Sequence, residues 1–134
     1  MTARGRLVVD ASAFVGLLLD PGPSGARVGE LVATAAVHAP ALLPFEVANA
    51  LRRLELSGRL SRTEAALAHE DATRLPIELW PYEVVAHRVR QLTGALTAYD
   101  ASYVALAELL GARLVTADRR LAAAPDVRCE LLVV

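Results

Sequence analysis

The chain has no lysine, a single cysteine and few aromatic residues. Its 14 basic residues are all arginine and stand against 15 acidic residues, so the net charge of −1 provides no global field that would draw the protein onto nucleic acid. Any site for a polyanion must therefore be local. Cys129, being alone, can form neither an intramolecular disulfide nor a cysteine-rich zinc site.

The sequence also lacks long apolar runs. No segment reaches the roughly 18 uninterrupted apolar residues that a membrane span requires, so none is expected. The apolar stretch near the N-terminus is interrupted by Asp10, and no small-residue cleavage site follows it cleanly, so a signal peptide is not expected. We therefore expect a cytoplasmic protein.

Aliphatic residues dominate what is present. Hydrophobic residues make up 54% of the 134 residues and aromatic residues only 4%, which predicts one domain over residues 1–134 with a core of Leu, Val and Ala. Because every cationic side chain is a guanidinium, each one can contact a phosphate bidentately.

Short apolar runs alternate with segments of helical periodicity. Strands are predicted at residues 6–9, 37–39, 77–79, 113–116 and 131–134, and helices at residues 11–19, 24–36, 43–57, 61–75, 83–96, 97–110 and, briefly, 118–123. Ser61 and Glu64 have the spacing of a capping box, and Gly58 and Gly111 follow helices as stop signals. The alternation predicts an α/β domain with a central parallel β-sheet flanked by α-helices.

Four carboxylates stand where a metal site could use them. Asp10 and Asp118 each end an apolar run, and ligands of open α/β sheets bind just beyond the carboxyl ends of the strands. Glu46 and Asp100 lie near the starts of two predicted helices. Gathered carboxylates repel by roughly 4 kcal/mol per pair at 4 Å near a protein surface. A divalent cation that prefers oxygen ligands, Mg²⁺ or Mn²⁺, would remove that repulsion.

Each acid taken alone has an ordinary structural explanation. Asp10 and Asp118 suit helix N-caps, whereas Glu46 and Asp100 suit the first turn of a helix, where the macrodipole favours negative charge. The set of four is what favours a site.

The same residues carry a family resemblance. The segments Val8–Ser12, Glu46–Leu51, Tyr99–Ala107 and Leu114–Leu121 occur in the order seen in PIN-domain proteins, and the chain closely resembles VapC-type toxins of bacterial toxin–antitoxin pairs over about residues 6–134. The resemblance implies a single PIN-like domain and a metal-dependent endoribonuclease that leaves a 5′-phosphate and a 3′-hydroxyl. It also implies an acidic site formed by Asp10, Glu46, Asp100 and Asp118, supported by Ser12, Thr116 and Asn49.

These roles define a mechanistic hypothesis. Asp10, Asp100 and Asp118 would hold Mg²⁺ or Mn²⁺ directly or through waters, and Glu46 would ligate a second ion or orient the attacking water. Candidate phosphate contacts on the RNA substrate come from two arginine pairs, which are Arg119 with Arg120 and Arg52 with Arg53.

The resemblance further implies protein partners. These are a second copy of the chain, giving a homodimer, and a cognate VapB-like antitoxin whose C-terminal segment enters a groove. Apolar stripes at residues 43–57 and 83–96 are the candidate surfaces, with ordinary core packing as the default explanation.

Competing functions remain open at this level. A receiver domain would need a lysine on a late strand, and a haloacid-dehalogenase-like phosphatase would need an aspartate where Ser12 stands. The histidines (His38, His69 and His87) show no pairing with a serine or cysteine nucleophile, which disfavours a histidine-based ribonuclease. The main alternative is a catalytically inactive module of the same fold that binds antitoxin or RNA. The RNA target and the number of metal ions are not encoded in this spacing.

Overall fold

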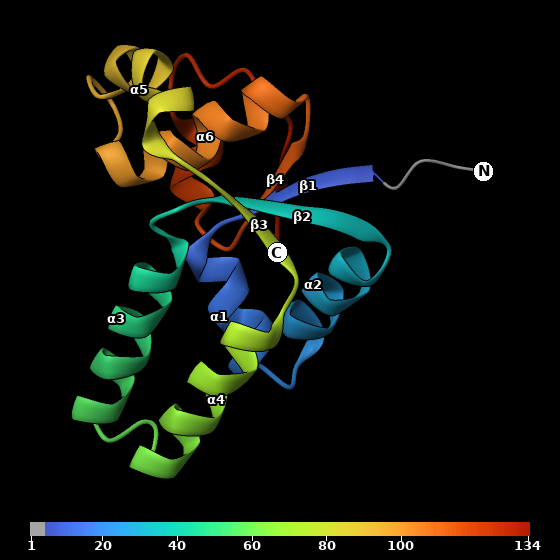
Figure 1. Cartoon of the computed structure of the whole chain (residues 1–134), viewed down its shortest axis with the longest axis vertical. Coiled ribbons are helices and arrows are strands. Elements are labelled where there is room, and N and C mark those ends of the chain that lie inside the picture. Colours follow the sequence, from blue (N-terminus) through green and yellow to red (C-terminus); the bar gives the residue numbers. More distant parts are fainter. Residues whose placement is uncertain (1–4) are drawn as a thin grey trace.

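A five-stranded parallel sheet organises the chain, with strand order β3-β2-β1-β4-β5 (Figure 1). The computed structural model describes residues 5–134. The strands are β1 (Gly5–Val9), β2 (Ala35–Pro40), β3 (Ile77–Trp80), β4 (Arg113–Thr116) and β5 (Leu131–Val133). The runs that end at Asp10 and Asp118 form β1 and β4, which lie side by side inside the sheet, so their carboxyl ends meet at one edge.

Helices cover both faces of this sheet. They are α1 (Ala11–Leu19), α2 (Pro23–Ala33), α3 (Leu43–Leu56), α4 (Arg62–Arg74), α5 (Ala86–Leu92) and α6 (Ala98–Leu110), with 3-10 turns η1 (Tyr82–Val84) and η2 (Arg119–Ala123). In Figure 1, α5 and α6 lie above the sheet and α1 to α4 lie below it. Every residue from Ala101 to Ala107 is buried, because α6 packs across β1, β2 and β4. Small Ala side chains allow that close approach.

Helix ends follow the predicted signals. The side chains of Asp10, Ser61, Thr97 and Asp118 all cap helices, and Ser61 with Glu64 completes the capping box. Gly111 ends α6 with a φ of 61°, in the left-handed region that favours glycine. The predicted α/β class, parallel sheet and flanking helices are therefore confirmed.

Two predicted helices were too long. The helix expected at residues 24–36 ends at Ala33, because Ala35 and Ala36 pair with Gly5 and Arg6 and begin β2. Tertiary strand pairing overrides local propensity here.

The helix expected at residues 83–96 is divided into η1 and α5 and ends at Leu92. The Thr93 hydroxyl donates to the Arg90 carbonyl at 3.0 Å, and Gly94 follows, which ends the helix locally. Val85, Val89 and Leu92 are nevertheless buried as the pattern predicts.

The apolar stripes at residues 43–57 and 83–96 belong to the core. Val47 and Leu51 of α3 and Val89 and Leu92 of α5 are all buried in the same cluster. Between residues 5 and 134, no helix is long and apolar enough to cross a membrane.

Candidate active site

Asp10 is the buried centre of the acidic site. It lies between β1 and α1 with 6% of its surface exposed. Its Oδ1 accepts hydrogen bonds from Ser12 Oγ at 2.6 Å and from the Ala13 amide at 3.0 Å, and its Oδ2 accepts one from Thr116 Oγ1. Burial raises the pKa of Asp10 above its usual range, opposed by these hydrogen bonds and assisted by the charge of Asp118.

The two hydroxyl groups also connect Asp10 to the turn after β4. Ser12 Oγ accepts a hydrogen bond from the Ala117 amide, and Thr116 Oγ1 accepts one from the Asp118 amide, both at 3.0 Å. Both hydroxyls thus donate to Asp10, and both accept from backbone amides at or next to Asp118. This arrangement fixes the separation of Asp10 and Asp118 without adding charge.

Asp118 is turned toward an arginine. Its carboxylate accepts from Arg120 Nε at 3.0 Å, from Arg120 Nη2 at 2.9 Å and from the Arg120 amide at 2.9 Å. These hydrogen bonds with Arg120 lower the pKa of Asp118. Arg120 itself is 87% exposed along its side chain, so solvent screens this pair.

Glu46 enters the site from the first turn of α3. Ala50 and Arg53, four and seven residues later, share its face of the helix. Tyr103 Oη donates to Glu46 Oε1 at 2.6 Å. Burial raises the pKa of Glu46, and the charges of Asp100 and Asp10 raise it further against the lowering effect of Tyr103.

Asp100 enters from the first turn of α6. Thr97 caps this turn by accepting from the Asp100 amide at 3.2 Å, which leaves the Asp100 carboxylate for the site. Burial raises the pKa of Asp100, and the nearby charges of Asp118 and Asp10 add to that effect. Tyr103, three residues on, shares the same helix face.

All four predicted acids line one pocket of about 300 Å³. They come from four separate segments of the chain, and the remaining lining residues are Ala11, Ser12, Val15, Ala50, Arg53 and Tyr103. Burial raises the pKa values of Asp10, Glu46 and Asp100, and the neighbouring carboxylates raise them further, as expected of negative charges held together.

These carboxylates do not converge on a single point as they stand. Within residues 5–134, no group of three or more Asp, Glu, His or Cys side chains is arranged to hold a metal ion. Asp118 faces Arg120, and Asp10 is engaged by its hydroxyl partners. The donor set nevertheless suits a hard cation, since all four groups are carboxylates and together they carry excess negative charge. Direct coordination by three of them would require side-chain rotation, and water bridges are the other route.

The supporting and basic residues divide between the pocket and the surface. Ser12 lines the pocket, Thr116 contacts Asp10, and Arg53 lines the pocket's edge. Asn49, three residues after Glu46 on α3, is exposed and outside the pocket lining. Arg52 and Arg119 are exposed on the surface.

Sequence reasoning assigned no role to Tyr103. A tyrosine within an Ala- and Leu-rich helix, three residues after Asp100, was the available signal, because a buried phenol needs a hydrogen-bond partner.

The histidines lie outside the acidic pocket. His38 is 6% exposed, and its Nδ1 accepts from Trp80 Nε1 at 3.0 Å, so it has a structural partner. Nucleophilic or general-base chemistry by histidine therefore has no support in the pocket.

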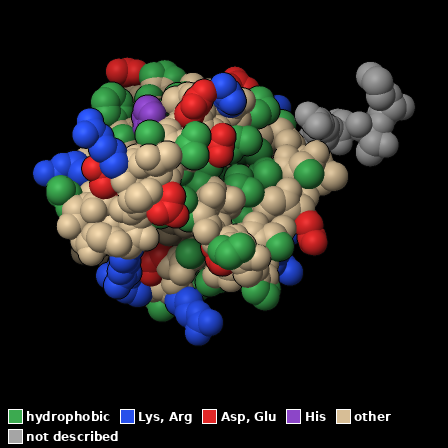
Figure 2. Space-filling view, turned by 90° about the horizontal axis from the view of Figure 1, so that it is seen from below, with side chains coloured by type: hydrophobic (Ala, Val, Ile, Leu, Met, Phe, Trp, Pro, Cys, Tyr) green, Lys and Arg blue, Asp and Glu red, His purple; other side chains and the backbone are tan. Residues whose placement is uncertain are grey.

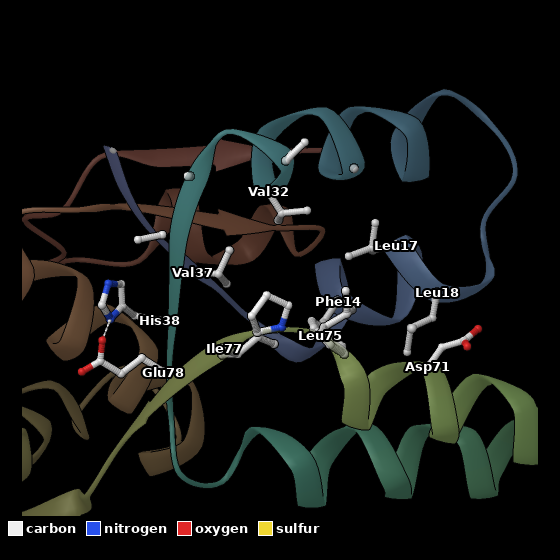
Figure 3. Close-up of a pocket in the computed structure, with 15 residues that line it drawn as sticks. Phe14, Leu17, Leu18, Val32, Val37, His38, Asp71, Leu75, Ile77 and Glu78 are labelled. Atoms are coloured by element: carbon white, nitrogen blue, oxygen red, sulfur yellow. Dashed lines mark ion pairs between the residues drawn. The ribbon is translucent and has the colours of Figure 1, made fainter. Parts of the chain in front are cut away.

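An apolar groove of about 880 Å³ forms a second feature, bounded by α1, α2, β2 and the segment from α4 to β3. Phe14, Leu17, Val32, Val37 and Ile77 surround it (Figure 3). His38, Asp71 and Glu78 also line it, with His38 Nδ1 3.5 Å from Glu78 Oε2, which places polar and acidic groups beside the apolar ones. No residue of the two apolar stripes at residues 43–57 and 83–96, the candidate partner surfaces, lines this groove.

The surface charge is unevenly distributed. On the face seen in Figure 2, arginine side chains lie toward the rim, and hydrophobic side chains are exposed nearer the middle. This pattern agrees with local rather than global attraction of a polyanion.

Comparison with known proteins adds independent information. A family model described as PIN domain matches residues 7–127. Ribonuclease VapC9 of Mycobacterium tuberculosis is 39% identical over 128 residues, which cover 96% of this chain and 98% of the relative.

Two solved structures share the fold. VapBC2 from Rickettsia felis, bound to a promoter DNA fragment, has a TM-score of 0.66 at 12% identity and covers 94% of this chain and 98% of that chain. VapC20 of M. tuberculosis, described as a sarcin-ricin loop cleaving toxin, has a TM-score of 0.63 at 18% identity and covers 89% and 95%. The PIN model extends over four of the five strands and over all four acids of the pocket, and the chain therefore belongs to the PIN-domain family.

Proposed function

We propose that this chain is a Mg²⁺- or Mn²⁺-dependent endoribonuclease of the VapC kind, neutralised by a cognate antitoxin. The observation that carries the proposal is the gathering of Asp10, Glu46, Asp100 and Asp118 from four segments into one pocket. The relatives named VapC ribonucleases, with about the same length as this chain, support the same activity.

The residues of the pocket fit the proposed ion by chemistry. Asp10, Asp100 and Asp118 are its candidate ligands, and Glu46 is the candidate for a second ion or for the attacking water. A divalent ion held there would supply activation of water and charge neutralisation at the phosphate. Ser12 and Thr116 hold the Asp10 carboxylate in one orientation, so it need not reorganise during reaction.

Arginines around the pocket are the proposed grip on RNA. Arg53 lies at the pocket itself, and Arg120 lies beside Asp118, so both are near enough to serve phosphates adjacent to the scissile one. Arg52 and Arg119 are exposed neighbours that would extend this contact along the backbone.

A catalytically inactive binding module is the competing proposal. It gives no reason for keeping four carboxylates in one pocket, where burial and neighbouring negative charges raise the pKa values of Asp10, Glu46 and Asp100. A module that had lost catalysis would be more stable with some of these acids neutral, and we therefore favour the enzyme.

A cleavage assay tests the activity directly. Wild type should cut single-stranded RNA in Mg²⁺ or Mn²⁺ and should be silent in EDTA. Asp10→Asn and Asp118→Asn should abolish cleavage with folding retained. Asp126→Asn is a matched control, because Asp126 is exposed and lies outside the pocket. Full activity of Asp10→Asn in Mg²⁺ would refute the site.

We propose that the apolar groove receives the antitoxin. Its volume of about 880 Å³ and its apolar lining suit the apolar face of an amphipathic segment, and Asp71 and Glu78 suit flanking basic residues of that segment. The VapBC2 structure, whose name joins a toxin with its antitoxin, supports a partner of this kind.

Variants of the groove separate neutralisation from catalysis. Leu17→Glu should weaken binding of the proposed antitoxin, yet RNA cleavage by the free chain should persist. Leu67→Glu, on an exposed residue of α4 outside the groove, should leave capture unchanged. Equal capture by both variants would contradict this assignment of the groove. The homodimer remains a prediction, and gel filtration at micromolar concentration tests it.

A further inference from the structure

Tyr103 connects the two helical layers inside the acidic pocket. Its side chain is 1% exposed, and its hydroxyl donates to Glu46 Oε1 at 2.6 Å across 57 residues of sequence. In Figure 1, α6, which carries Tyr103, lies above the sheet, whereas α3, which carries Glu46, extends below it. We propose that Tyr103 is a positioning residue that holds Glu46 toward the metal and the attacking water. This inference rests on the proposed function.

Glu46 needs such support more than the other acids do. Asp10 has a short side chain and three hydrogen-bond donors around it. Glu46 has a longer side chain, and among the described residues its carboxylate accepts a hydrogen bond from Tyr103 alone. The charges of Asp100 and Asp10 act against it, so an unsupported carboxylate would turn toward solvent or toward Arg53.

The hydrogen bond uses only one oxygen of Glu46. Since Oε1 is held by the phenol, Oε2 is the oxygen left to contact an ion or a water. Ligating carboxylates are commonly oriented by hydrogen bonds of this kind, and loss of such a partner typically lowers metal affinity or activity by about 10- to 100-fold.

A neutral donor is better suited to this task than a cation. Arg120 neutralises Asp118 while it binds it, and so competes with any ion for that carboxylate. Tyr103 orients Glu46 and leaves its charge for the ion. The Tyr103 hydroxyl donates to Glu46 Oε1 and brings no charge of its own to the pocket.

Core packing is the competing role for Tyr103. Its ring belongs to the buried cluster of α6, and the ring alone could explain why an aromatic residue stands there. Tyr103→Phe keeps the ring and removes only the hydroxyl, so it separates the two roles. A packing role predicts an unchanged affinity for metal, whereas a positioning role predicts a loss.

The test measures Mn²⁺ affinity by electron paramagnetic resonance without RNA, and steady-state cleavage in parallel. Tyr103→Phe should weaken Mn²⁺ binding by about tenfold and lower kcat by about tenfold with KM unchanged. In a Glu46→Ala background, Tyr103→Phe should have no further effect on either quantity, because no side-chain oxygen remains at position 46 to accept from the phenol. Tyr82→Phe, which removes an exposed phenol from η1, is the matched control and should behave as wild type.

Three outcomes are decisive against the inference. Wild-type Mn²⁺ affinity and kcat in Tyr103→Phe would overturn it and leave the proposed function intact. The same fold-loss from Tyr103→Phe with and without Glu46 would also overturn it, since Tyr103 would then act independently. A wild-type protein with neither Mn²⁺ binding nor Mn²⁺-dependent cleavage would overturn the proposed function as well.

Discussion

The two ends of α6 carry buried or half-buried acids with opposite electrostatic surroundings. Near its C-terminus, Glu108 accepts from Arg88 Nε at 2.7 Å, from Arg88 Nη2 at 3.4 Å and from the Arg128 amide at 2.9 Å. Near its N-terminus, Asp100 shares a pocket with Asp10 and Asp118, and burial raises its pKa, to which the charges of Asp118 and Asp10 add. The same helix thus has one carboxylate matched by a cation and one placed among other anions.

This difference separates a structural acid from a functional one. Glu108 joins α5, α6 and the segment before β5, since Arg88 also donates to the Asp126 carbonyl at 2.5 Å. The hydrogen bonds from Arg88 and from the Arg128 amide balance the Glu108 carboxylate within the folded chain, so it needs no external cation. The pocket around Asp100 leaves charge unbalanced, and that imbalance is available for an external cation.

Among substitutions that compare the two ends of α6, the largest expected effect is on catalysis, from Asp100→Asn. Cleavage should fall by about 10³-fold, the order that follows loss of one group acting on charge in the transition state. The thermal midpoint without metal should stay the same or rise, because the substitution removes repulsion. RNA cleavage and calorimetry measure the two quantities. A clear loss of stability would assign Asp100 to the same class as Glu108.

Glu108→Gln should do the reverse on the same helix. The free energy of unfolding should fall by about 2 kcal/mol, because Arg88, only 18% exposed along its side chain, loses its charged partner. Cleavage under conditions where the variant is folded should equal that of wild type. Urea denaturation and the cleavage assay test both halves, and a cleavage defect in folded protein would break the comparison.

The pH dependence of stability should also separate the two ends. Burial raises the pKa values of Asp10, Glu46 and Asp100, whose ordinary values are 3.8, 4.5 and 3.8. The folded state therefore holds protons that the unfolded state has lost, and stability from this pocket is present below about pH 4 and lost as pH rises through the raised values.

The difference in the free energy of unfolding between a variant and wild type isolates the contribution of one acid to this pH dependence. Without metal, Asp100→Asn should gain stability relative to wild type as pH rises from about 4 to 7, and Glu108→Gln should show no such gain. Mg²⁺ should raise the wild-type melting temperature more at pH 7 than at pH 4. A flat difference between Asp100→Asn and wild type would contradict unbalanced charge in the pocket.

The sequence was sufficient for features set by local chemistry and by strand position. Asp10 and Asp118 meet because each ends a strand and the two strands are neighbours, and Asp10, Thr97 and Asp118 cap helices as their residue types predict. The alternation of elements was enough to predict the parallel sheet.

Features that depend on helix phase and on long-range contact were not predictable in the same way. Asn49 and Arg53 both lie on the side of α3 that carries Glu46, yet only Arg53 lines the pocket. The Tyr103–Glu46 hydrogen bond joins helices from different layers, and no local spacing encodes it. The apolar groove lies between α1, α2 and β2, whereas Val47, Leu51, Val89 and Leu92 of the predicted stripes are buried in the core.

The smallest expected effect comes from replacing Arg120, because its partner Asp118 is paired with a cation and also lines the acidic pocket. Its pair with Asp118 resembles the Arg88–Glu108 pair in its geometry, but 87% exposure of its side chain makes it weak and replaceable. Arg120→Gln should leave the melting temperature within about 1 °C of wild type. It should tighten Mn²⁺ binding by roughly twofold, because Asp118 is freed, and should lower the salt slope of RNA binding by about 1.

Arg74→Gln, which breaks an exposed pair with Glu70 on α4, provides the control and should change neither quantity. If Arg120→Gln instead destabilised the protein as much as Glu108→Gln, the Asp118 pair would be structural, and the separation between the matched and the unbalanced acids of this fold would fail at that residue.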